Sequence, residues 1–193
     1  MIPSFRRAFT LICWVCCAIG TPAASAAGAA GVAAPEARQF DFLIGQWQVS
    51  GEVKTSGLVA LIHGRPKLVG SWNAWQVADG HTIEDDLTLT DAAGNPSSAV
   101  HYTRTFSREE NCWKITGRNT KTGGAPPATA RWQGDKMLMM GSGTSPDGKR
   151  YRSRTHFAAI TAVSFRVVQD RSYDDGKTWE AAAVTLDVRR AGS

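Results

Sequence analysis

Apolar and polar residues alternate with a period of two along most of the chain from residue 45 to residue 190. The apolar positions are rich in β-branched and aromatic residues, and turn-forming pairs such as Asp79-Gly80 and Asp175-Gly176 separate the alternating stretches. This pattern is typical of short, half-buried β-strands joined by tight turns. It predicts ten strands, over residues 45–54, 66–78, 80–90, 98–107, 111–118, 128–133, 136–142, 149–158, 163–173 and 178–190.

Ten consecutive strands with short turns predict an all-β fold. Closure of this meander into a single antiparallel up-and-down β-barrel would leave no exposed strand edge, and a two-sheet sandwich is the alternative. The only helical element expected is a short helix or 3-10 turn between Pro35 and Leu43. The longest irregular joins are Lys54 to Pro66 and Asn119 to Ala128; the second is rich in Gly and Pro and is expected to be a surface loop.

The N-terminal region has the organisation of a secretory signal peptide: a basic start, a short apolar run and the small-x-small sequence Ala24-Ser25-Ala26. We expect residues 1–26 to be removed, residues 27–39 to form a flexible Ala/Gly-rich leader, and residues 40–190 to form one barrel domain. The apolar run is too short for a good membrane span, and a retained anchor is the alternative. The expected location is therefore the periplasm or the cell exterior.

Removal of that segment changes the charge and the cysteine content. Loss of Arg6 and Arg7 leaves 20 basic residues against 17 acidic ones, so the net charge falls from +5 to +3. This small excess is weak support for a polyanionic partner, and no nucleic-acid-binding motif is present. Cys112 would be the only remaining cysteine, so no intramolecular disulfide is expected and the thiol is interpreted as a small buried hydrophobic group.

No catalytic or metal-binding constellation is evident in the sequence, and Gly-x-Ser-x-Gly does not occur. The run HTIEDD, from His81 to Asp86, resembles a set of metal ligands. On a strand, however, only His81 and Asp85 share a face, and they would lie about 13 Å apart. We interpret these acids as the solvated face of an exposed strand, and we predict no metal site and no catalytic residue.

Two segments resemble the signature ends of a bacterial lipocalin-like family that is known chiefly as domains of unknown function. They are FDFLIGQW, residues 40–47, before the first strand, and SYDDGKTWE, residues 172–180, before the last. The resemblance covers Phe40 to Arg190 and extends to the wider calycin group, which includes lipocalins, fatty-acid-binding proteins and the haem-carrying nitrobindins. It implies a closed antiparallel barrel with an internal cavity, and it assigns no general activity.

The resemblance also implies a role for Trp47, because in calycins the tryptophan of Gly-x-Trp crosses the barrel floor and a basic residue of the last strand stacks on it. Arg190 shares the apolar face of the last strand with Val184, Leu186 and Val188. A lone guanidinium there would be costly unless paired. We predict that Trp47 and Arg190 form a structural clamp through a cation–π contact; the alternative is that Arg190 frays into solvent near the C-terminus.

Alternation sorts the strand residues into inner and outer faces. Arg104, Gln169 and Arg171 fall on inner faces beside apolar residues, which suits a ligand with an apolar body and a carboxylate head. The alternative is that these long side chains lie at a rim and reach water. The predicted ligand-binding set is Tyr102, Arg104, Tyr151, Phe157, Val167, Gln169 and Arg171. The predicted outer row is Arg150, Arg152, Arg154 and His156.

A haem site like that of nitrobindins would require an axial histidine inside the barrel on a late strand. The final strand has none, and alternation turns His156 outwards, although a register error of one residue would reverse that assignment. No cofactor is therefore predicted.

The tryptophans other than Trp47 are expected to fill the core. On residues 136–142 the pattern does not decide whether Met137 and Met139 or Leu138 and Met140 face inwards.

Taken together, these patterns predict an exported protein that binds a small apolar or amphipathic molecule, with a carboxylate as the candidate head group. Two alternatives stay open. The barrel interior could instead be filled, and the protein would then act through its surface as an interaction module. An enzyme would require a titratable group inside the cavity, and the sequence offers no well-placed candidate.

Overall fold

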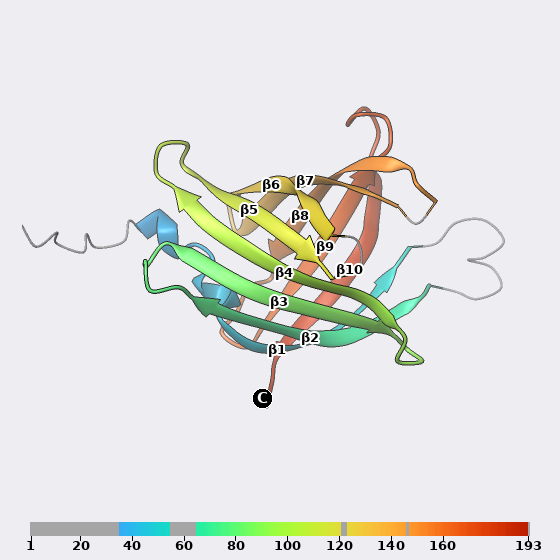
Figure 1. Cartoon of the computed structure of the whole chain (residues 1–193), viewed down its shortest axis with the longest axis horizontal. Helices are drawn as coiled ribbons and strands as arrows, with labels where there is room; N and C mark the ends of the chain where they lie inside the picture. Colours follow the sequence, from blue (N-terminus) through green and yellow to red (C-terminus); the bar gives the residue numbers. More distant parts are fainter. Residues whose placement is uncertain (1–34, 55–64, 121–122, 146, 193) are drawn as a thin grey trace, which may run out of the picture. The chain divides into compact units, whose positions relative to one another are not determined.

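The structure is a computed structural model that describes residues 35–54, 65–120, 123–145 and 147–192. The predicted signal peptide, most of the predicted leader and the join at residues 55–64 lie outside the described residues. Ten antiparallel strands form one closed barrel in which each strand pairs with its neighbours in sequence and β1 pairs with β10 (Figure 1). This confirms the up-and-down barrel and excludes the sandwich. The strands are β1 Gly45–Val53, β2 Lys67–Gln76, β3 Thr82–Asp91, β4 Pro96–Ser107, β5 Cys112–Asn119, β6 Gly123–Gln133, β7 Lys136–Thr144, β8 Arg150–Ala158, β9 Ser164–Ser172 and β10 Glu180–Arg190.

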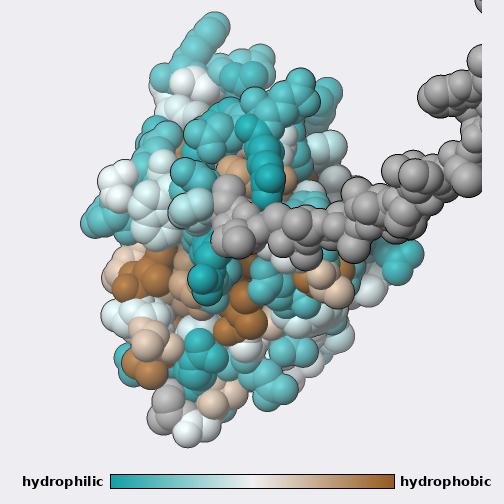
Figure 2. Space-filling view, turned by 90° about the vertical axis from the view of Figure 1, so that its left-hand side faces the viewer, coloured by the Kyte–Doolittle hydropathy of each residue, from teal (hydrophilic) through white to brown (hydrophobic). Residues whose placement is uncertain are grey.

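Two short 3-10 turns precede the barrel, η1 at Pro35–Arg38 and η2 at Asp41–Leu43, which confirms the helical turn expected there. Phe40, between them, is fully buried and packs edge-to-face on Trp113 and Phe157, with ring centroids 5.1 and 5.7 Å apart. The aromatic run of the signature segment therefore fills one end of the barrel, which we call the floor. Figure 2 views the molecule from this end and shows small clusters of apolar residues among hydrophilic residues.

The sheet differs from the prediction at residues 119–128, where most of the expected loop is strand. Residues 123–125 of β6 pair with residues 117–119 of β5. The pairing of β6 with β7 begins only at Thr129, and the β5–β6 register shifts between Ile115 and Gly117. Pro126 and Pro127 fall in this irregular stretch, where their missing N–H groups cost no ladder hydrogen bond. A Gly/Pro-rich segment can therefore remain part of the sheet.

The second signature segment is the turn between β9 and β10. The carboxylate of Asp174 accepts hydrogen bonds from the backbone N–H and the hydroxyl of Thr178, at 2.9 and 2.6 Å. Gly176 donates its N–H to the hydroxyl of Ser172 at 2.7 Å, and the indole of Trp179 donates to the carbonyl of Gly176 at 3.1 Å. These bonds lower the pKa of Asp174 to about 2, the side-chain bond from Thr178 being the main cause. The segment is therefore a locked turn.

Three tryptophan positions depart from the expected core filling. Trp72 and Trp113 are buried, but Trp75 and Trp132 are 36% and 38% exposed and Trp179 is half-buried. Trp75 occupies an outward position of β2, where alternation governs burial more strongly than residue type. Trp132 has the inward parity of β6 and is paired in register with buried Met137, but it is the penultimate residue of the strand; its ring lies 6.5 Å from that of Phe42 and remains partly exposed. On β7 the structure turns Met137 and Met139 towards the core, and Met140 is exposed. Cys112 is buried, in agreement with its interpretation as a small hydrophobic group.

Candidate functional site

The barrel floor is closed by the predicted pair of Trp47 and Arg190. The Cζ atom of Arg190 lies 4.3 Å from the Trp47 ring centroid. Its Nε donates to the carbonyl of Ala162 at 3.0 Å, and the indole of Trp47 donates to the carbonyl of Leu43 at 2.6 Å. The clamp thus joins β1, β10, η2 and the connection between β8 and β9. Arg190 is held at several points, so the alternative of a frayed side chain is wrong.

Gly45, the glycine of Gly-x-Trp, is required by this clamp. Its φ of 127° lies in the region that favours glycine, and a Cβ atom there would collide with the guanidinium of Arg190. The local motif therefore sets both the backbone path into β1 and the space for the stacked arginine.

Directly above the floor lies a buried ion pair that the sequence interpretation missed. Asp85 and Arg104 are 0% and 1% exposed. Nε and Nη2 of Arg104 donate to the two carboxylate oxygens of Asp85 at 2.5 and 3.1 Å, and the indole of Trp72 donates to the same carboxylate at 2.7 Å. The interpretation of the HTIEDD acids as a solvated face is therefore wrong for Asp85. The available signal was its alternation with Ile83 and Leu87, both buried.

Aromatic rings surround the Arg104 guanidinium. Its Cζ atom lies 5.0 Å from the ring of Phe40 and 5.1 Å from that of Tyr102, with Trp72 and Phe157 at 5.9 and 6.0 Å. Because Nε and Nη2 both bind Asp85, Nη1 occupies the edge of the planar group that faces away from the carboxylate. Nη1 is buried and has no hydrogen-bond partner among the described residues. The alternative that Arg104 lies at a rim and reaches water is wrong.

Above this pair, side chains leave a cavity of about 260 Å³ inside the barrel. All seven residues of the predicted ligand-binding set line it. The lining also includes residues outside the predicted ligand-binding set. They are Val53, Leu68, Trp72, Leu87, Leu89, Ser97, Ser98, Met139, Thr155, Val184 and Leu186. Val53, Thr155, Val184 and Leu186 belong to strand faces that alternation had grouped, whereas the strands of Leu68, Trp72, Leu87 and Leu89 were not sorted by face. Most of these additional residues are apolar, so the walls can bury the apolar part of a small molecule.

A second arginine of the cavity wall is Arg171, near the end of β9. Its Nε donates to the side-chain carbonyl of Gln169 at 2.9 Å, and its Cζ atom lies 4.5 Å from the Tyr151 ring centroid. The amide of Gln169 in turn lies 3.4 Å from the hydroxyl of Thr155. No carboxylate of the described residues forms an ion pair with Arg171. This guanidinium is thus oriented by neutral groups. Glu180, its register partner on β10, forms an ion pair with Lys54 at 3.7 Å instead.

Two tyrosines of the wall lie over glycines of the neighbouring strand. Tyr102 is paired in register with Gly117, and Tyr151 with Gly143. A Cβ atom at residue 117 would lie 2.9 Å from Cε1 of Tyr102, and one at residue 143 would lie 2.5 Å from Oη of Tyr151. The missing side chains therefore leave room for the phenol rings against the sheet.

A second cavity of about 420 Å³ adjoins the first along β5, β6 and β7. Tyr102, Met139, Tyr151 and Gln169 line both cavities, so these four side chains form the partition between them. The second cavity is lined mainly by small residues, which include Gly141 and Ala128. It lies beside the part of β6 that makes no recorded ladder with β7.

The groups around the cavity favour binding over proton transfer. Both oxygens of Asp85 already accept hydrogen bonds from Arg104 and Trp72, and Asp85 does not line the cavity. Burial raises the pKa of Tyr102, so its hydroxyl stays protonated at neutral pH. No group of three or more His, Cys, Asp or Glu residues suited to a metal ion occurs in the described part of the chain.

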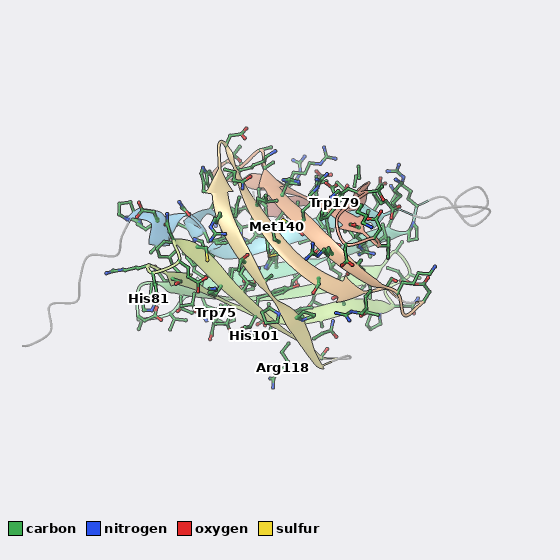
Figure 3. All side chains as sticks on the ribbon, turned by 90° about the horizontal axis from the view of Figure 1, so that it is seen from above. Trp75, His81, His101, Arg118, Met140 and Trp179 are labelled. Atoms are coloured by element: carbon green, nitrogen blue, oxygen red, sulfur yellow. The ribbon has the colours of Figure 1, made fainter. Side chains whose placement is uncertain are left out.

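The lining residues do not fit a haem held by histidine. No described histidine lines the cavity. His81 and His101 lie on the outside of the barrel, with Trp75 (Figure 3). His156, on the outer face of β8, lies 3.8 Å from the carboxylate of Asp170. His63 falls outside the described residues.

No protein-family model and no curated protein matches the chain significantly. The fold is nevertheless similar to that of solved structures. Rv2717c from M. tuberculosis aligns with a TM-score of 0.55 at 15% identity, over 81% of this chain and 98% of that one. The S-type phycobiliprotein lyase CPES from Guillardia theta aligns with a TM-score of 0.53 at 12% identity, over 82% and 96%. These likenesses concern the fold, a closed antiparallel β-barrel.

In the described part of the chain, no helix has the length and apolar character needed to cross a membrane.

Proposed function

We propose that this protein binds a small amphipathic molecule with an acidic group in the cavity of its barrel. The observation that carries the proposal is the Arg171 guanidinium, which lies in the wall of an otherwise largely apolar cavity without a carboxylate partner. An acidic ligand would supply the missing negative charge. Its apolar body would lie against side chains such as Leu68, Leu87 and Val167, where burial contributes about 25 cal/mol per Å² of apolar surface.

Arg171 is already held in place for this role. Gln169 fixes its Nε and the Tyr151 ring lies against its Cζ, so little side-chain entropy is lost when an anion binds. A guanidinium also offers paired N–H donors that match the two oxygens of a carboxylate. The seven predicted residues enter the proposal together because they line one continuous surface.

We keep two finer assignments as part of the proposal. Export rests on the N-terminal sequence pattern, and membership of the bacterial lipocalin-like family rests on the two signature segments. The alternative of a barrel that acts only through its surface is less well supported, because its interior would be expected to be filled by side chains. Lyase chemistry is not carried over from the phycobiliprotein lyase, because a likeness at 12% identity concerns the fold.

The decisive experiment compares two arginine variants with the anionic fluorescent probe 8-anilinonaphthalene-1-sulfonate. We expect Arg171→Leu to weaken probe binding about tenfold, which corresponds to about 1.4 kcal/mol, with little change in melting temperature. Arg118→Leu is the matched control, since Arg118 is exposed on the outside of β5 (Figure 3). Equal weakening in both variants would contradict the proposal, as would losses of affinity and melting temperature of similar size.

Native mass spectrometry of the mildly purified full-length product gives an independent reading. A ligand-binding barrel should carry additional mass that denaturation releases, whereas a filled barrel should carry none. The mass of the polypeptide itself tests export, because cleavage after Ala26 would remove the first 26 residues.

A further inference from the structure

We infer that the ligand has a second polar end: a neutral hydrogen-bond acceptor, such as a carbonyl oxygen, that lies at the floor and accepts a hydrogen bond from Nη1 of Arg104. The acidic group would then lie at the other end, against Arg171. This inference rests on the proposed function and narrows it from an acidic amphipathic molecule to an extended molecule with an acid at one end and a neutral acceptor at the other.

The unsatisfied donor is the first observation. Arg104 is 1% exposed and lines the cavity, and its Nη1 has no partner among the described residues. A buried N–H of a charged group that lacks an acceptor is costly. The aromatic rings around Arg104 offer no lone pair, and Asp85 is already bound by the other two nitrogens. No described side chain supplies this acceptor, so a molecule bound in the cavity is the source that we infer.

The charge at each end of the cavity decides which acceptor fits where. At the floor, Arg104 and Asp85 form a pair without net charge. A second anion placed there would be repelled by Asp85 and would lose its hydration, so a neutral acceptor is favoured. At the other end Arg171 has no acidic partner among the described residues, so the anion is favoured there. The cavity is therefore electrically asymmetric along its length.

Strand direction separates the two arginines along the barrel axis. β4 runs towards the floor, and Arg104 is three residues before its end at Ser107. β9 runs away from the floor and ends at Ser172, and Arg171 is its penultimate residue. The 5.0 Å contact of Arg104 with Phe40 places it at the floor. A single ligand that reaches both guanidinium groups must therefore be extended, with its polar groups at opposite ends and an apolar middle.

The test uses pairs of rigid aromatic acids that differ only in the acceptor. Each pair consists of an acetyl acid and its isopropenyl analogue, which has the same shape and charge but no carbonyl. Three lengths cover the span of the cavity: 4-acetylbenzoic acid, 6-acetyl-2-naphthoic acid and 4'-acetylbiphenyl-4-carboxylic acid. We expect the wild-type protein to bind the acetyl member about tenfold more tightly at one of the three lengths, as measured by calorimetric titration.

The double variant Asp85→Leu/Arg104→Met removes the donor without leaving an unpaired charge. Whatever its absolute affinity for the pair, it should bind the acetyl and the isopropenyl acid equally well and so lose the preference for the acetyl acid. Equal affinity of the two members at all three lengths in the wild type would overturn the inference, as would a preference that persists in the folded double variant. Failure of all probes, including 8-anilinonaphthalene-1-sulfonate, would instead overturn the proposed function, so the two failures are distinguishable.

Discussion

The two ends of this barrel share one alternating sequence pattern and differ in what the inward positions carry. At the floor, inward positions hold large buried rings, such as Trp47, Trp113 and Phe157. Trp113 and Phe157 pack edge-to-face on Phe40, and Trp47 packs in the same way on Phe165. Towards the other end, inward positions include Gly117 and Gly143, and the rings of Tyr102 and Tyr151 occupy the space that a side chain at either glycine would take. Alternation thus defines the inside of a barrel, and side-chain volume decides whether that inside is a core or a cavity.

The polar groups differ between the ends in the same way. Near the floor, Arg104 donates two hydrogen bonds to the carboxylate of Asp85, and the indole of Trp72 donates a third to it. Only Nη1 of Arg104 is left without an acceptor among the described residues. Farther up, Arg171 is positioned by Gln169 and has no acidic partner among the described residues. Arginine near the floor therefore serves structure first, and arginine near the other end is available to a ligand.

The largest expected effect concerns the floor. Asp85→Ala would leave Arg104 buried without its counter-charge, and the free energy of unfolding should fall by about 3–5 kcal/mol, as measured by urea denaturation. The control is Asp85→Leu/Arg104→Met, which replaces the pair by apolar groups and should recover most of that loss, less about 1 kcal/mol for the unpaired Trp72 indole. If Asp85→Ala were as stable as the wild type, the distinction between a structural Arg104 and a ligand-binding Arg171 would be contradicted.

An intermediate effect is expected in the upper half, on binding more than on stability. Gly143→Ala places a Cβ atom 2.5 Å from the hydroxyl oxygen of Tyr151, so the ring must move into the cavity and take Arg171 with it. Fluorescence titration should show 8-anilinonaphthalene-1-sulfonate bound about fivefold more weakly. The matched control is Gly124→Ala on β6, where a Cβ atom would have no neighbour within 4 Å. Unchanged binding in Gly143→Ala would argue that Tyr151 does not shape the cavity.

The smallest effect is expected at the β9–β10 turn, which belongs to neither the floor nor the cavity wall. The pKa of Asp174 is lowered from its ordinary value of 3.8 to about 2, chiefly by the hydrogen bond from the Thr178 side chain. The ionised carboxylate therefore stabilises the fold at pH values above 3.8, and this contribution is lost as the pH falls towards 2.

Asp174→Asn should flatten the dependence of the urea midpoint on pH between about pH 5 and pH 2. Asp135→Asn, in the turn between β6 and β7, serves as the comparison, because no hydrogen bond to its carboxylate is recorded among the described residues. A slope in Asp174→Asn as steep as that of the wild type would show that the turn is held by other groups.

Much of the fold and of the cavity lining could be predicted from the sequence, because period two is a property of the extended backbone itself. It correctly grouped residues as distant as Tyr102 and Arg171 on one lining surface. The same rule applied to HTIEDD would have turned Asp85 inwards, but the neighbouring acids suggested a solvated strand. The extent of β6 was missed because Gly and Pro ordinarily indicate loops, and only the local absence of a β7 partner explains their tolerance.

The sequence by itself determined that this chain forms antiparallel strands with a wet and a dry face, because each residue's side is set by its own place along the strand. It also determined the locked β9–β10 turn, whose hydrogen bonds join residues three or four positions apart. Only the tertiary structure decided that Asp85 meets Arg104, that Arg171 lacks an acidic partner among the described residues, and how much space the side chains leave between them. Those properties depend on distances across the barrel, which strand closure and packing set and which no local pattern contains.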